Sequence, residues 1–259
     1  MLEATQFEYD LALLDWHLEL GADEAIGETP INRYALEKPA PKPKPAAAPA
    51  PHTPITAAPV AFNSTPLAQA CNSLDALRSE VESFAHCTLK QGARTTVFCD
   101  GNPAARVMII GEAPGREEDR EGKPFIGRAG LLLDKMFAAI GLSRHEAAPE
   151  SALYITNVLP WRPPQNRDPK PEEIALMKPF LLRHIELVQP DFIVTMGNAS
   201  TKTLRDTALG INKMRGQWGE VLGIPALPLF HPAYLLRSPE KKREAWADLL
   251  SLKARLDGK

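Results

Sequence analysis

The chain has few cysteines, no long apolar run and almost no net charge. Only three of its 259 residues are cysteine, Cys71, Cys87 and Cys99. Such a small, odd number excludes a disulfide framework and favours a reducing compartment. No stretch approaches the roughly 18 apolar residues that a membrane-spanning helix needs, and the acidic N-terminus lacks the basic and apolar regions of a signal peptide. We therefore expect a soluble, cytoplasmic protein of bacterial type with no membrane partner.

The small net charge of −2 excludes a uniformly basic, histone-like binder and an acidic solvating chain, but it hides a strong asymmetry. Residues 1–36 hold eight acidic residues and one basic residue, which gives −7. Residues 37–66 hold one acid and three lysines, which gives +2, and the remaining residues 67–259 therefore carry +3. The largest part of the chain thus has the sign that suits a DNA backbone.

Proline, by contrast, is abundant: 25 residues, concentrated between Pro39 and Pro66. Such a Pro/Ala-rich run is extended and poorly ordered. We predict an acidic helical segment at 1–36, a disordered linker at 37–66 and a globular domain at 67–259. The N-terminal segment is too small to hold a core, so it either docks on the domain, where it would compete with DNA, or binds another protein.

Apolar runs and helical patterns alternate in the predicted domain. Strands are expected at 106–110, 153–158, 192–196 and 226–230, and helices at 67–84, 129–140, 171–188, 199–209 and 241–256. This order predicts a three-layer α/β/α sandwich with a short, mostly parallel central sheet. Ligands of such folds bind at the carboxyl ends of the strands, which singles out loops 111–115, 157–166, 197–200 and 231–239.

Three polar side chains stand at these strand ends. Glu112 lies in a Gly-Glu-Ala-Pro-Gly turn that matches neither a Walker A loop nor the dinucleotide fingerprint. Asn157 ends an apolar strand, where its carboxamide needs a partner, although a structural cap is an alternative interpretation. His231 ends another strand. Their expected convergence on one sheet edge favours a functional site over three separate structural roles.

Four motifs then follow in order along residues 67–259: Gly-Glu-Ala-Pro-Gly-x-x-Glu-Asp at 111–119, Gly-x-Pro-Phe-Ile-Gly-Arg-Ala-Gly at 122–130, Arg-Pro-Pro-x-Asn-Arg at 162–167 and His-Pro-Ala-Tyr-Leu-Leu-Arg-x-Pro at 231–239. Together they resemble a family 4 uracil-DNA glycosylase. The resemblance implies that fold, a monomer associated with the nucleoid, and hydrolysis of the N-glycosidic bond of uracil in DNA during base excision repair, with the base flipped into the strand-end pocket. A glycosylase for another deaminated base such as hypoxanthine, or a non-catalytic DNA-binding repair scaffold, is the alternative.

The resemblance also assigns roles to residues. Phe125 would stack on uracil, Asn157 would read its edge, and His231 would donate to O2, where negative charge develops. The positions for catalysis or for placing the water are Glu112, Glu118 and Asn166, and which of them orients the water stays open. The base site is completed by Gly111 and Ala113. Expected DNA contacts are Arg128, Arg167, Asn198, Leu235 and Arg237, with Leu235 and Leu236 entering the duplex; the preference for single or double strands stays open.

Family 4 enzymes hold a [4Fe–4S] cluster on four cysteines, and the sequence departs from this pattern. The matching positions are Phe84, Cys87, Trp161 and Met177. One thiolate cannot hold such a cluster, so we expect no metal and no cofactor, with apolar packing in their place. The Lys-Arg-Arg-Ile-His insertion of the relatives that trap DNA covalently is also missing, so the resemblance implies a hydrolytic reaction.

Overall fold

The computed structural model describes Leu11, Leu13 and residues 62–258. The predicted helix in residues 1–36, apart from Leu11 and Leu13, and the predicted linker up to residue 61 lie outside the described residues. All elements named below belong to the second of the two units into which the chain divides, Ala57–Lys259.

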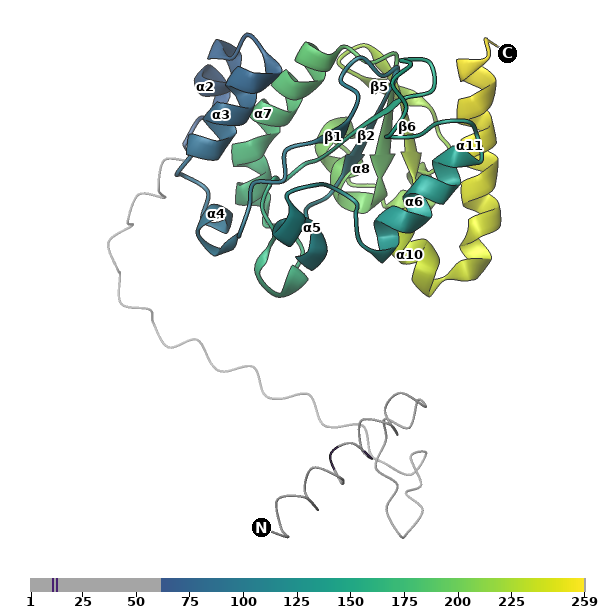
Figure 1. Ribbon diagram of the computed structural model, residues 1–259, viewed down its shortest axis with the longest axis horizontal. Helices are drawn as coiled ribbons and strands as arrows, with labels where there is room; N and C mark the ends of the chain where they lie inside the picture. The colour runs from purple at the N-terminus through teal and green to yellow at the C-terminus, as the bar shows by residue number, and fades with distance from the viewer. Residues whose placement is uncertain (1–10, 12, 14–61, 259) are drawn as a thin grey trace, which may run out of the picture. The chain divides into compact units, whose positions relative to one another are not determined.

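Six strands form one mixed sheet in the order β1-β3-β2-β4-β6-β5 (Figure 1). The four central strands are parallel: β2 (Val107–Gly111), β3 (Leu153–Asn157), β4 (Phe192–Met196) and β6 (Ile224–Leu229). Two short antiparallel strands lie at the edges, β1 (Asp100–Gly101) and β5 (Gly219–Val221). The mostly parallel sheet is confirmed, and the edge strands escaped prediction because neither exceeds three residues.

Helices cover both faces of the sheet, which confirms the three layers (Figure 1). One face carries α2 (Thr65–Ala70), α3 (Leu74–Ser83), α7 (Pro171–Val188) and α8 (Gly197–Arg205); the other carries α6 (Arg128–Ala138), α10 (Pro232–Arg237) and α11 (Lys242–Leu256). The short helices are α4 (Leu89–Gly92), α5 (Arg116–Glu121) and α9 (Ile211–Met214), with 3-10 turns at Pro164–Asn166 and Pro239–Lys241. Within residues 62–258 no helix has the length and apolar character to cross a membrane.

Side chains of the central strands alternate between two cores. In β2, Met108 and Ile110 pack under α3 and α7, whereas Val107 and Ile109 pack under α6 and α11. All four are fully buried. A slip of one residue in register would exchange the two sets, so this pattern fixes where β2 ends and where its loop begins.

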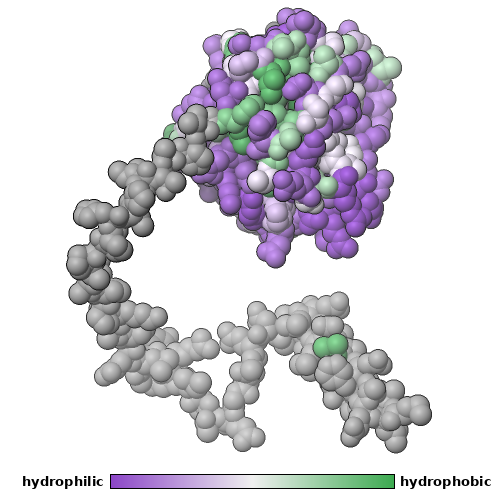
Figure 2. Space-filling view, turned by 90° about the vertical axis from the view of Figure 1, so that its left-hand side faces the viewer, coloured by the Kyte–Doolittle hydropathy of each residue, from purple (hydrophilic) through white to green (hydrophobic). Residues whose placement is uncertain are grey.

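At the outer end near α2 and α3, hydrophilic side chains surround a band of apolar ones (Figure 2).

The start of the folded part lies earlier than predicted. The linker was expected to extend to Pro66, but α2 begins at Thr65, and the Oγ of buried Ser64 donates to the Leu176 carbonyl at 2.6 Å. The single helix expected at 67–84 is two helices, because Ser73 caps α3 by accepting from the Ala76 N–H at 3.1 Å. A serine at an N-cap position has a non-helical backbone, so it separates α2 from α3 and starts the second helix.

Candidate active site

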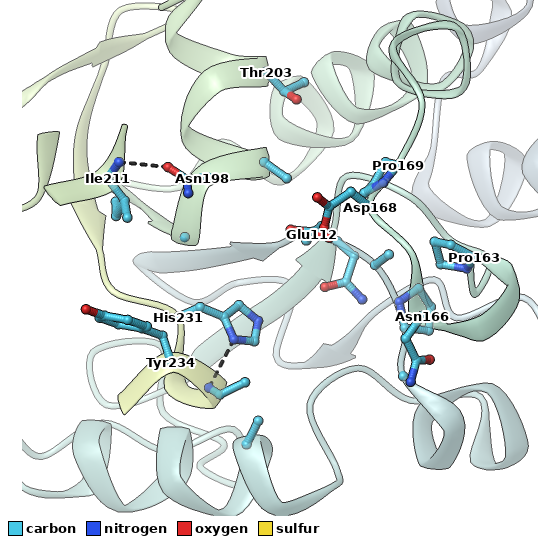
Figure 3. A pocket seen from close by; sticks show the side chains of 18 of the residues that line it. Glu112, Pro163, Asn166, Asp168, Pro169, Asn198, Thr203, Ile211, His231 and Tyr234 are labelled. Carbon is cyan, nitrogen blue, oxygen red and sulfur yellow. Dashed lines mark hydrogen bonds between the residues drawn. The ribbon is translucent and has the colours of Figure 1, made fainter. Parts of the chain in front are cut away.

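The carboxyl ends of β2, β3, β4 and β6 open into one cavity of about 850 Å³ (Figure 3). Ten of the residues predicted from the sequence line it: Glu112, Ala113, Glu118, Phe125, Asn157, Asn166, Arg167, Asn198, His231 and Arg237. Arg128 lines a smaller adjoining hollow with Arg116 and Arg120. The expected convergence at one sheet edge is therefore what the fold produces.

An aromatic ring forms one wall of the cavity. The Phe125 ring is 6% exposed and stacks on the His231 imidazole, with centroids 5.4 Å apart and planes inclined by 28°. Gly111, at the end of β2, permits this position, because a Cβ there would come within 2.5 Å of the Phe125 ring. The same Cβ would also collide with the Asn157 side-chain oxygen. Gly111 thus shapes the site by the absence of a side chain.

The His231 ring is fixed in one tautomer. Its Nδ1 accepts from the Ala233 N–H at 3.1 Å, as the dashed line in Figure 3 shows. A nitrogen that accepts carries no proton, so the proton of the neutral ring is on Nε2, which is left as a donor. Burial, and to a smaller extent nearby Arg237, lower the pKa of His231 to about 4, against the opposing effect of Glu118. The ring is therefore neutral at pH 7.

The Asn157 carboxamide is available to a ligand. The residue is 6% exposed at the last position of β3, where parallel pairing places it opposite Gly111. Its side chain makes no hydrogen bond with the part of the chain that the structure describes. Its polar atoms are open to the cavity, because no fully buried side-chain N or O atom among the described residues lacks a hydrogen-bond partner. The arrangement therefore suits a ligand that offers one donor and one acceptor edge to edge.

The two glutamates of the first motif have different surroundings. Glu118 accepts three backbone N–H bonds, from Gly115 at 3.1 Å, Ile126 at 3.0 Å and Gly127 at 2.9 Å. It thus ties the start of α5 to the loop that carries Phe125. Glu112 accepts no hydrogen bond from the described residues, and it lies beside Asp168 in the cavity (Figure 3). Burial raises the pKa of Glu112, and the negative charge of Asp168 raises it further.

The loop after β3 is held by its own polar contacts. Asn166 is exposed, and its Oδ1 accepts from Arg162 Nε at 2.8 Å. Arg167 forms a two-pronged ion pair with Glu173, at 2.6 and 2.9 Å. The Glu173 carboxylate is almost buried and also accepts the Lys170 N–H, so it caps α7. Arg167 therefore anchors the loop to α7 with the group that was expected to contact DNA.

The prediction for Leu235 is wrong in this fold. Leu235 is 1% exposed and packs with Phe230 and Ala245, so it cannot enter a duplex without leaving the core. Successive residues of a helix point in directions about 100° apart, and in α10 the next residue, Leu236, is 38% exposed. Of the other predicted DNA contacts, Arg128, Asn198 and Arg237 are exposed, and Asn198 also accepts the Ile211 N–H at 2.7 Å (Figure 3).

Some lining residues were not singled out from the sequence, among them Asp168, Lys202 and Tyr234. Asp168 directly follows the Arg-Pro-Pro-x-Asn-Arg motif, and that proximity is the one signal that pointed to it. Lys202 lies on the second turn of α8 and Tyr234 on α10, and each faces the cavity through helix geometry alone. Tyr234 belongs to the motif at 231–239, although no role was assigned to it there, whereas nothing in the local sequence separates Lys202 from ordinary surface residues.

The four positions matching the cluster ligands do not fit a [4Fe–4S] cluster. Phe84, Cys87, Trp161 and Met177 are each at most 2% exposed and belong to one apolar core. Only one of them can supply a thiolate, and four are needed; burial also raises the pKa of the Cys87 thiol. Trp161 is held by its Nε1 donating to Thr96 Oγ1 at 3.1 Å. Residues 62–258 contain no group of three or more His, Cys, Asp or Glu side chains able to hold a metal ion.

Comparison with known proteins places this geometry in a family. Residues 98–250 match the family model described as "Uracil DNA glycosylase superfamily". The type-4 uracil-DNA glycosylase of Sulfurisphaera tokodaii is 39% identical over 181 residues, covering 66% of this chain and 80% of the relative. That of Thermotoga maritima is 37% identical over 185 residues, covering 70% and 93%.

A more distant similarity points the same way. The type-5 uracil-DNA glycosylase of Pyrobaculum aerophilum is 30% identical over 147 residues, covering 52% of this chain and 64% of the relative. The matched regions include the four strand-end loops that line the cavity. The chain therefore belongs to the uracil-DNA glycosylase superfamily, in its type-4 family.

Proposed function

We propose that this chain hydrolyses the N-glycosidic bond of uracil in DNA and leaves an abasic site, the first step of base excision repair. Relatives named type-4 uracil-DNA glycosylases support the substrate and the reaction. The observation that carries the proposal is the cavity itself, where an aromatic ring, a carboxamide without a hydrogen bond to the described residues and a neutral imidazole donor meet. A base inside a duplex cannot reach these groups, so it must be flipped out of the stack.

Recognition of uracil follows from the Asn157 carboxamide. A base stacked on Phe125 presents its N3–H and O4 edge to a group that has one acceptor and one donor. The Asn157 oxygen accepts from N3–H, and its NH₂ group donates to O4. Cytosine has an acceptor at N3 and a donor at C4, so it would leave buried polar groups unpaired. Such unpaired groups give strong discrimination.

Bond cleavage needs stabilisation of two charges. As the bond between C1′ and N1 breaks, its electron pair stays on the uracil, whose O2 becomes negative, and the sugar becomes a cation. His231 donates from Nε2 to O2, and a positioned donor of this kind contributes about 3 kcal/mol. We assign the attacking water to Glu112, because its oxygens accept no hydrogen bond from the described residues, whereas those of Glu118 are used by three backbone N–H groups. The water attacks C1′ and its proton passes to the carboxylate.

DNA contacts are assigned to exposed residues around the cavity. Arg128 and Arg237 would meet phosphates, and Leu236 would fill the space that the flipped base leaves. The catalytic unit is the predicted domain 67–259, extended back to Ser64 by its buried hydrogen bond. We propose that this unit acts as a monomer on nucleoid DNA, and that the acidic segment 1–36 recruits a protein partner.

The reaction is proposed to need no cofactor. Each group assigned to base binding or catalysis is an amino-acid side chain of the cavity, and the four cluster-ligand positions lie in the core under α3 and α7. The large side chains of Phe84, Trp161 and Met177 occupy these positions. Apolar packing of suitable volume preserves a core, so we assign to these residues the stabilising role that a cluster has in the family.

The proposal is tested with the full chain and three oligonucleotides that carry a single uracil, a single hypoxanthine or a G:T mismatch. We expect alkali-labile abasic sites and free uracil from the first oligonucleotide alone. Abasic product from hypoxanthine in place of uracil would shift the substrate to another deaminated base. No abasic product from any of them, with retained DNA binding, would overturn the enzymatic proposal.

A further inference from the structure

A buried arginine contacts the backbone of the segment that carries Phe125, and it does so from outside the cavity. Arg144 follows α6, its side chain is 3% exposed, and it does not line the cavity. Its Nη1 donates to the Pro124 carbonyl at 2.8 Å, and its Nη2 donates to the Phe125 carbonyl at 2.9 Å. One guanidinium thus holds two successive carbonyl groups of the segment that presents the ring.

Two carboxylates hold the guanidinium in turn. Arg144 Nε and Nη2 meet Asp134 of α6 at 2.9 and 2.8 Å, and Nη1 meets Asp100 of β1 at 3.2 Å. A guanidinium has five N–H groups in a fixed planar fork; four of them donate hydrogen bonds here, and Nη2 also lies in ion-pair contact with Asp134. Arg144 therefore has a single orientation, set by the sheet on one side and by α6 on the other.

The Phe125 backbone requires such support. Its φ is 52°, in the left-handed region that residues with a Cβ rarely adopt. On the far side of the same peptide, α6 packs so closely that a Cβ at Gly130 would collide with the Phe125 carbonyl. The Phe125 carbonyl is thus held between Gly130 and Arg144, and this placement directs the ring towards His231.

We propose that Arg144 is a positioning residue for uracil excision, which holds the Phe125 backbone so that the ring lies at stacking distance from the base. This inference rests on the proposed function. A role confined to anchoring the loop before β3 would use Asp100 and Asp134 alone. The two carbonyl contacts at Pro124 and Phe125 are what link Arg144 to the base site.

The first test is Arg144→Lys in the full chain. Lysine keeps the positive charge beside Asp100 and Asp134, but its single nitrogen cannot reach both carbonyls as the planar fork does. We expect kcat for uracil release to fall by about 10- to 100-fold and the inhibition constant of free uracil to rise by about tenfold, since a small misplacement of a contact group is costly.

The matched control is Arg106→Lys. Arg106 pairs with Asp191 at 2.6 Å at the amino end of β2, opposite the cavity. This control should keep both constants within about twofold of wild type, as surface ion pairs contribute little. If Arg144→Lys and wild type have equal kcat values and equal inhibition constants for free uracil, the inference is overturned.

A second test separates positioning from general structural support. Arg144→Lys is added to Phe125→Ala, which lacks the ring. If Arg144 acts through Phe125, the added change alters kcat and uracil inhibition by less than about twofold in that background, because the two residues act as one unit. A loss as large as in the wild-type background would overturn the inference. Affinity for an oligonucleotide with an abasic analogue should stay within about twofold in all variants, since its contacts are to phosphate.

The outcomes distinguish this inference from the proposed function. A wild-type chain that releases no uracil defeats the proposed function, whereas an active wild type with an equally active Arg144→Lys defeats the inference alone. If thermal unfolding shows that Arg144→Lys is unfolded at the assay temperature, Asp134→Ala takes its place. It removes the carboxylate that aligns Nε and Nη2, so the guanidinium loses its fixed alignment with the two carbonyls, and we expect a loss in the same direction of about threefold or more. Unchanged constants in Asp134→Ala would then overturn the inference.

Discussion

Phe125 and His231 stack on each other although 105 residues separate them in the sequence: their centroids are 5.4 Å apart. The first precedes α6 and the second follows β6 at the start of α10, so this contact joins two faces of the base site. A base that stacks on Phe125 lies beside an imidazole whose orientation the Ala233 N–H fixes. Stacking and hydrogen bonding to the base therefore depend on one another.

The first prediction concerns the pH dependence that His231 confers. Burial, and then Arg237, lower its pKa to about 4, so the donor form persists and the excision rate should show no inflection near the ordinary histidine value of about 6.5. Between these values the unfolded chain binds a proton that the folded chain does not, so stability decreases as pH falls from 6.5 towards 4. Urea unfolding at pH 7 and 5 should show a smaller stability difference in His231→Gln than in wild type.

An inflection of the excision rate near pH 6.5 that disappears in His231→Gln would contradict this account. His184 serves as the internal reference: burial also lowers its pKa, to about 3, its Nε2 lies 2.7 Å from the Tyr154 hydroxyl, and neither residue lines the cavity. Its contribution to the loss of stability in acid has the same sign and remains in His231→Gln.

The second prediction concerns base recognition. Asn157→Asp replaces the group that donates to O4 with a second acceptor, which repels O4. We expect kcat/KM for uracil to fall by about 100-fold or more, as for other buried unpaired groups. Asn102→Asp is the control, because Asn102 holds a surface turn through Ala104 and Ala147. Uracil release by Asn157→Asp at the rate of this control would refute the recognition role.

The third prediction separates two glutamates by opposite effects. Glu118→Gln places an NH₂ group against backbone N–H donors, so the free energy of unfolding should fall by about 1–3 kcal/mol. Glu112→Gln should leave stability at pH 7 unchanged or higher, since the raised pKa of Glu112 means that its charged form is disfavoured in the folded state. Excision should nevertheless fall sharply in Glu112→Gln. Denaturant unfolding combined with single-turnover kinetics measures both; loss of stability in Glu112→Gln with full activity would reverse the assignment.

The fourth prediction uses two adjacent leucines. Leu235→Ala empties a core position and should cost about 2–5 kcal/mol of stability. Leu236→Ala should leave stability within about 0.5 kcal/mol, as surface changes do, and should slow excision from duplex DNA more than from single strands. The ratio of the two rates is the measurement. An equal slowing of excision from duplex and from single-stranded DNA would show that Leu236 does not fill the space that the flipped base leaves in the duplex.

The fifth prediction concerns iron. Purified under anaerobic conditions, the full chain should be colourless and should show no absorbance band at about 400 nm. It should also contain no stoichiometric iron, because a cluster needs about four thiolates. Uracil excision should survive treatment with an iron chelator. The informative variant is Cys87→Ala, which should lose stability through its cavity and keep the absorbance spectrum unchanged. Iron at four atoms per chain would refute the prediction.

The residues of the site that could be predicted are those at strand ends. Parallel strands bring their carboxyl ends to one edge, so Glu112, Asn157 and His231 had to meet once the strands were assigned. The phase of a short helix is harder to predict. Whether Leu235 or Leu236 is buried depends on how the six residues of α10 pack against Phe230 and Ala245.

Arg144 shows why another part of the site could not be predicted. Its partners lie on β1, on the loop before α6 and on α6 itself, so no local spacing links them. A buried arginine in a loop has no periodic pattern, and its role follows from tertiary packing alone. The same holds for Arg167, where the sequence motif indicated a cation but not the carboxylate that neutralises it.

The ion pair of Arg167 with Glu173 has a consequence for DNA binding in salt. A protein that neutralises phosphates releases condensed counterions. The logarithm of its binding constant therefore falls with the logarithm of the salt concentration, with a slope of about −0.9 for each phosphate contacted. A guanidinium that already faces an internal carboxylate displaces few such ions. The exposed cations that form no ion pair within residues 62–258, namely Arg116, Arg128, Lys202 and Arg237, therefore contribute most to the slope at this edge. Affinity for DNA should thus decline gently with ionic strength, less than a count of basic residues around the cavity would suggest.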